Sequence, residues 1–68
     1  MTTKKGLTRR QLEIMNLVKV GYANKQIGYE LCISINTAKT IIRAVMKRLG
    51  ANDRAHAVYL CMKRGIID

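Results

Sequence analysis

Five polar side chains in the middle of the sequence share one side of a predicted helix over residues 35–49. At about 100° per residue they fall opposite the apolar positions, and no acidic residue lies among them. Arginine and lysine donate hydrogen bonds to guanine, asparagine can pair with adenine, and threonine can contact a thymine methyl group or a phosphate. One helix with such a face fits the major groove of DNA. The five residues are Asn36, Lys39, Thr40, Arg43 and Lys47.

Scattered basic residues more often form a solvated surface, so the alternative to a DNA-binding face is an ordinary exposed helix. The charge of the whole chain favours nucleic acid, because thirteen lysines and arginines against four acids give a net charge of +9 on 68 residues. A balance of this sign attracts polyanions, which include nucleic acid, anionic membranes and acidic proteins. The only aromatic residues are three tyrosines, which argues against stacking on single-stranded bases. We therefore expect double-stranded DNA as the partner.

Several other classes of protein are disfavoured by the composition. One histidine and four scattered acids, without a nucleophile–base spacing, provide nothing from which to build an active site, so we expect neither an enzyme nor a cofactor. Cys32 and Cys61 form no C-x-x-C motif, and we expect both to be small buried hydrophobes rather than metal ligands or a disulfide. No apolar run approaches the roughly 18–20 residues that span a bilayer, and the N-terminus does not resemble a secretory signal. We expect a cytoplasmic, nucleoid-associated protein that does not bind membranes.

Capping residues and glycines divide the chain into the helices that would position the polar face. Thr8 and Gln11 form a capping box at the start of the first helix, and Ser34 and Asp53 are good N-caps for the third and fourth. A glycine follows three of the helical stretches, where a left-handed residue is preferred. Residues 1–68 are therefore predicted to form a single all-α domain of four helices joined by short turns. The helices are expected at about residues 9–20, 24–31, 35–49 and 54–64, and the glycines are Gly21, Gly50 and Gly65.

Apolar periodicity indicates which side of each helix faces the core. Gly28 lies beside the apolar face of the second helix, where a glycine costs about 1 kcal/mol relative to alanine. We expect that this glycine allows another helix to approach closely. The expected inner positions are Leu12, Met15, Leu17, Val18, Ile27, Leu31, Ala38, Ile42, Val45, Leu49, Ala57, Val58 and Cys61.

Four short motifs follow one another in a fixed order between Leu7 and Ile67. They are Leu7-Thr8 with Arg10 and Glu13, Asn24-Lys25-Gln26-Ile27 with Leu31, Ile33-Ser34 with Thr37-Ala38-Lys39, and Arg48-Leu49-Gly50 with Arg54, Ala57, Val58 and Gly65-Ile66-Ile67. In residue type and spacing they resemble the LuxR/GerE-type helix-turn-helix domain of bacterial transcription regulators. The resemblance implies a four-helix DNA-binding domain whose third helix enters the major groove.

The resemblance also implies roles for individual residues. The base-contacting positions of the family correspond to Lys39, Thr40 and Arg43. Its phosphate-contacting positions correspond to Asn24, Lys25, Asn36 and Thr37, and the helical wheel adds Lys47. In the family the fourth helix commonly forms a two-fold dimer contact, and here its outward side would supply the interface of a homodimer. The residues expected in that interface are His56, Tyr59, Leu60 and Lys63.

The chain departs from the family pattern on the third helix, where Ile41 stands in place of histidine and Ala44 in place of asparagine. Both changes make that helix less polar. An alternative function is therefore an interaction protein that heterodimerises with a larger LuxR-type regulator and inhibits it. Another transcription regulator and RNA polymerase are the further partners considered. Because no receiver or ligand-binding domain accompanies the motifs, we expect a stand-alone regulator, controlled by its amount or by a partner.

Overall fold

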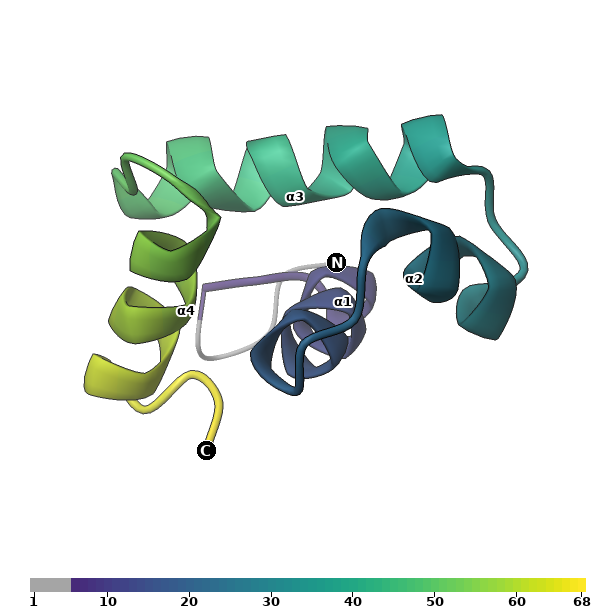
Figure 1. The fold of residues 1–68 in the computed structure, drawn as a ribbon. Helices are drawn as coiled ribbons and strands as arrows, with labels where there is room; N and C mark the ends of the chain where they lie inside the picture. The colour runs from purple at the N-terminus through teal and green to yellow at the C-terminus, as the bar shows by residue number, and fades with distance from the viewer. Residues whose placement is uncertain (1–5) are drawn as a thin grey trace.

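The computed structural model describes residues 6–68, which form four helices. Helix α1 spans Arg9–Lys19, α2 Asn24–Leu31, α3 Ile35–Leu49 and α4 Arg54–Lys63. Helix α3 lies across one side of the molecule and packs against each of the other three (Figure 1). No strand occurs in the described part of the chain, so the all-α helix-turn-helix architecture is confirmed. Two helices end one residue earlier than expected, because Val20 and Arg64 serve as C-caps.

Side chains cap three of the helix starts as the sequence predicts. Thr8 and Gln11 form a reciprocal box: the Thr8 Oγ1 accepts from the Gln11 N–H at 3.1 Å, and the Gln11 Oε1 accepts from the Thr8 N–H at 2.9 Å. Ser34 caps α3 through the Thr37 N–H, and Asp53 caps α4 through the His56 N–H. Each cap satisfies a donor that has no acceptor inside its helix. The helix boundaries therefore follow from local chemistry.

The helix ends confirm the three expected glycines and reveal one exception. Gly21, Gly50 and Gly65 all have positive φ, at 97°, 73° and 69°. Helix α2 instead ends at Cys32, which takes the left-handed conformation with φ 57° although it carries a Cβ atom. Cys32 is exposed, so the expectation that it is buried was wrong; residue 32 serves as the C-cap of α2, and this turn lies at the surface.

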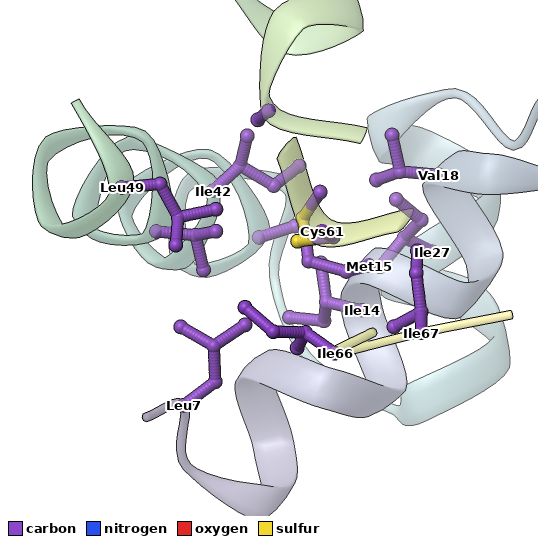
Figure 2. Packing of buried hydrophobic residues seen from close by; sticks show 13 residues of the cluster. Leu7, Ile14, Met15, Val18, Ile27, Ile42, Leu49, Cys61, Ile66 and Ile67 are labelled. Carbon is purple, nitrogen blue, oxygen red and sulfur yellow. The ribbon is translucent and has the colours of Figure 1, made fainter. Parts of the chain in front are cut away.

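Thirteen apolar residues from all four helices and both flanking segments form one core (Figure 2). The expected inner side of α3 is buried, and Cys61 lies in the centre of the core as expected. Burial raises the pKa of the Cys61 thiol, although nearby Arg64 partly opposes the shift. On α1 the burial differs from the prediction, since Ile14 is fully buried while Leu12 and Leu17 are only partly covered. The core comprises Leu7, Ile14, Met15, Val18, Ile27, Ala38, Ile42, Val45, Leu49, Ala57, Cys61, Ile66 and Ile67.

Gly28 does allow a close approach, but the neighbour is the turn that follows α2 and not another helix. A Cβ atom at this position would lie 2.7 Å from the backbone oxygen of Ile33. A hydrogen bond also ties this turn to α2, since the Ile33 N–H donates to the Gly28 carbonyl oxygen at 2.9 Å. Gly28 therefore lets the chain turn tightly from α2 into α3.

Among residues 6–68 no helix is long and apolar enough to cross a membrane.

Candidate nucleic-acid interface

The outward side of α3 carries all five polar residues that the sequence placed there. Asn36, Lys39, Thr40, Arg43 and Lys47 are exposed, while the opposite side of the helix is buried in the core. The only ion pair within residues 6–68 joins Arg10 to Glu13 on α1. The three cations on this side of α3, which are Lys39, Arg43 and Lys47, therefore remain available to an external anion. This surface, defined by these five residues, is called the α3 face below.

Ile41 does not belong to the α3 face. Its side chain is partly buried and packs against the core, whereas Ala44 is exposed. Of the two departures from the family pattern on this helix, only Ala44 therefore leaves an exposed position without a polar group. The cationic character of the face is retained.

Thr40 uses its hydroxyl hydrogen within the helix. The Thr40 Oγ1 donates to the backbone oxygen of Asn36, one turn earlier, at 2.9 Å. What this residue can offer to a base is therefore its methyl group and a hydroxyl oxygen that can only accept.

The start of α3 presents donors that suit a phosphate. The Ser34 hydroxyl donates to the Thr37 Oγ1 at 2.9 Å, so Thr37 keeps its own hydroxyl hydrogen for another acceptor. The first N–H groups of a helix have no partner inside it, and they lie at the positive end of the helix dipole. Asn36 and Thr37 are both exposed at this end. The geometry thus suits the phosphate contacts expected of these two residues.

The two candidate phosphate-contacting residues at the start of α2, Asn24 and Lys25, differ in exposure. Lys25 is exposed, whereas Asn24 is partly buried and its Oδ1 accepts a hydrogen bond from the Arg54 Nη1 at 2.6 Å. Ala23 precedes the helix and has no side-chain oxygen to cap it, although the Gln26 Oε1 accepts from the Ala23 N–H at 2.8 Å. Sequence reasoning used Arg54 only as a motif residue and missed its link to Asn24. The two residues lie 30 positions apart, and no local pattern connects them.

The four candidate dimer residues lie on α4 but differ in exposure. Tyr59 is 56% exposed and Lys63 is also exposed, whereas His56 and Leu60 are partly buried. The rings of His56 and Tyr59 stack with centroids 6.4 Å apart, and the Lys63 Nζ lies 5.8 Å from the Tyr59 centroid. Sequence reasoning did not name Met62, which is 48% exposed. Tyr59, Met62 and Lys63 form the outward part of α4.

The sequence is similar to a known family over most of its length. Residues 5–61 match the model of the family described as bacterial regulatory proteins, luxR family. The transcriptional regulatory protein LiaR of Bacillus subtilis is 39% identical over 62 residues, which cover 91% of this chain and 29% of LiaR. The transcriptional regulatory protein DegU of Brevibacillus brevis is 39% identical over 59 residues, which cover 87% of this chain and 25% of DegU. The chain thus spans less than a third of either relative.

Two solved structures share the fold. The transcription factor GerE superposes with a TM-score of 0.88 at 31% identity, over 91% of this chain and 92% of GerE. The response regulator ChrA of a heme-sensing two-component system superposes with a TM-score of 0.88 at 27% identity, over 97% of this chain and 33% of ChrA.

Proposed function

Because the chain belongs to the luxR family of bacterial regulatory proteins, we propose that it binds double-stranded DNA sequence-specifically and regulates transcription. The observation that carries this proposal is the α3 face, an exposed surface with three cations and no acid, held by a helix whose other side is buried. A helix anchored in this way enters the major groove as a rigid body. Binding to double-stranded DNA would place the protein on the chromosome, in the bacterial cytoplasm.

In the proposed complex, two groups of residues have different tasks. Lys39, Thr40 and Arg43 contact base edges, which distinguish one sequence from another. The second group binds phosphates and sets the position of the domain on the duplex. Since each phosphate contact releases counterions, affinity falls steeply with salt. The phosphate-contacting residues are Asn24, Lys25, Asn36, Thr37 and Lys47.

We further propose that two copies associate through α4. One domain of this size buries only about 600–1,000 Å² on DNA, and a two-fold dimer binds two half-sites about 34 Å apart. The exposed Tyr59 and Met62 supply apolar surface on the outward part of α4, and Lys63 lies at its edge. The interface residues proposed are His56, Tyr59, Leu60 and Lys63, of which His56 and Leu60 contribute through their uncovered edges.

The second candidate function is inhibition of a larger LuxR-type regulator through a heterodimer. The exposed Ala44, in place of a polar residue on the outward side of α3, is the observation in its favour. The partly buried Ile41 gives it no support, because that side chain packs on the core. In this case α4 would contact the regulator, and DNA binding by the chain itself would be negligible.

A titration of labelled duplex DNA distinguishes the two functions. A duplex is first selected from random sequences, and binding is then measured at two salt concentrations. We expect affinity that falls with salt, and Arg43→Ala should weaken binding to the selected duplex by about 1–3 kcal/mol.

Arg9→Ala is the matched control, since it removes the same charge from an exposed position on α1. It should produce only a small loss that is equal for selected and unrelated duplexes. Equal and negligible binding by the wild type and by Arg43→Ala would contradict the DNA-binding function and favour the heterodimer.

A further inference from the structure

Arg54, the first residue of α4, reaches the segment that leads into α2. Its Nη1 donates to the Asn24 Oδ1 at 2.6 Å, and its Nη2 donates to the carbonyl oxygen of Tyr22. The planar guanidinium can satisfy both acceptors at once, which a lysine ammonium cannot do in the same geometry. Arg54 thereby holds the backbone before α2 and the first side chain of that helix together.

This contact is not a by-product of helix packing. Helices α2 and α4 lie on different sides of α1 and do not pack against each other (Figure 1). Arg54 joins them through side-chain and backbone polar groups alone. The effect of the Arg54 guanidinium on the residues at the start of α2 therefore comes from its hydrogen bonds, and not from helix packing.

The contact leaves the charge of Arg54 without an acidic partner among residues 6–68. Both acceptors of Arg54 are neutral, and the only ion pair among residues 6–68 is elsewhere, on α1. The guanidinium also lies beside the start of α2, which carries partial positive charge and has no side-chain cap at Ala23. Two positive features at one place repel each other, but together they attract an anion.

The bond also determines which atoms of Asn24 remain free. Because the Asn24 Oδ1 accepts from Arg54, the amide nitrogen is oriented away from the guanidinium and keeps its two hydrogens for another acceptor. A phosphate oxygen is an acceptor of this kind. An Asn24 without Arg54 could turn its amide over and present the oxygen instead.

We propose that Arg54 is a positioning residue for DNA binding: it orients the Asn24 amide toward a backbone phosphate and adds positive charge at that point. This inference rests on the proposed function, and it gives α4 a second task besides the proposed dimer contact. Arg54 acts through Asn24, so the two residues should be energetically coupled in the complex with DNA.

A double-mutant cycle on DNA affinity tests the coupling. Arg54→Met is made in the wild type and in Asn24→Ala, and binding to the selected duplex is measured for all four proteins. In the wild type we expect about a tenfold loss, as for one charge-assisted hydrogen bond. In Asn24→Ala the same substitution should lower the affinity for DNA only about two- to threefold, which is the effect of removing one charge.

Arg64→Met is the matched control. Arg64 also lies at an end of α4, and its guanidinium donates to a backbone oxygen, that of Leu49 at 3.4 Å, without touching Asn24. Arg64→Met should lower the affinity for DNA about two- to threefold in both the wild type and Asn24→Ala, since only a charge is removed.

A spectroscopic measurement reports on Asn24 directly. Its side-chain amide signals in a proton–nitrogen NMR spectrum should shift when duplex DNA is added to the wild type, and should stay near their free positions in Arg54→Met. Thermal unfolding confirms that each variant is folded at the assay temperature. Should Arg54→Met not fold, Arg54→Lys replaces it, because this variant keeps the charge but cannot reach both acceptors.

The outcomes separate this inference from the proposed function. Equal losses for Arg54→Met in both backgrounds, with Asn24 signals that respond to DNA alike in both proteins, would overturn the positioning role and leave DNA binding intact. A wild type that binds no selected duplex would overturn both.

Discussion

Thr40 has one hydroxyl hydrogen, and α3 already uses it in a bond to the Asn36 carbonyl. At the scale of single residues this changes what the α3 face can recognise. Lys39 and Arg43 can donate to guanine, whereas Thr40 is left with a methyl group, which suits the methyl group of thymine. The exposed Ala44, one turn further along, would extend the same apolar strip.

Two substitutions at Thr40 separate the methyl group from the hydroxyl. Thr40→Val keeps a methyl group and should bind the selected duplex almost as tightly as the wild type. Thr40→Ser keeps the hydroxyl and should lose about 0.5–1 kcal/mol, the value of one buried methyl group. Fluorescence anisotropy with the selected duplex measures both.

A duplex with deoxyuridine in place of the contacted thymine provides the control, because it lacks the methyl group. The difference between wild type and Thr40→Ser should disappear on this duplex. A larger loss for Thr40→Val than for Thr40→Ser would mean that the hydroxyl oxygen makes the contact instead.

At the scale of elements, the turn between α2 and α3 controls how the α3 face is presented. Cys32 ends α2 in the left-handed conformation, and the Ile33 carbonyl then lies over Gly28. Two preferences compete at Gly28, since alanine favours a helix while the turn leaves no room for a Cβ atom. The close contact should outweigh helix propensity, because the Ile33 oxygen belongs to the backbone and cannot be moved away by rotating a side chain.

Gly28→Ala should therefore destabilise the protein. Helix propensity alone would add about 1 kcal/mol of stability. A Cβ atom 2.7 Å from the Ile33 oxygen forces the backbone to move, and overpacking of this kind costs about 1–3 kcal/mol. We expect a net loss, measured as a lower midpoint in urea unfolding.

Tyr29→Ala is the comparison variant, because Tyr29 lies next to Gly28 on α2 and is 86% exposed. It changes helix propensity at a side chain outside the core and should leave the midpoint unchanged or slightly higher. A stabilised Gly28→Ala would show that the turn between α2 and α3 moves aside to admit the Cβ atom.

At the scale of the whole molecule, the two proposed surfaces lie on different helices that share one core. Helix α3 contacts both α1 and α4, so the α3 face and the outward part of α4 are rigidly related. In a two-fold dimer through α4, this relation sets the distance between the two copies of α3 and hence the spacing of the half-sites.

Tyr59→Ala should weaken the dimer without affecting a single domain. On a duplex with two half-sites we expect about a tenfold loss of affinity, the effect of one interface anchor, while a single half-site is bound as before. Sedimentation velocity should show a shift toward monomer. Val20→Ala removes another exposed apolar side chain, 65% exposed and outside α4, and should change neither result. Equal losses on one and two half-sites would count against α4 as the dimer contact.

Four helices, the N-caps of three of them and the polar side of α3 could be predicted from the sequence. These features depend on residues within one or two turns of each other, as in the bond between Thr8 and Gln11 or that between Asp53 and the His56 N–H. Periodicity then separated the buried side of α3 from the exposed one, because this helix is long and packs against all three others.

The contacts between distant segments could not be predicted from the sequence and emerge only in the folded molecule. On α1, Ile14 is fully buried whereas Leu12 and Leu17 are only partly covered, in a core that also contains Leu7, Ile66 and Ile67 from the two flanking segments. Helix α1 has apolar residues on several sides, so its own sequence does not determine which of them is buried. The bond from Arg54 to Asn24 likewise requires the first residues of α4 and α2 to come together, across 30 residues of chain. Local spacing carries no information about such meetings, because they are fixed by how the helices pack around a shared core.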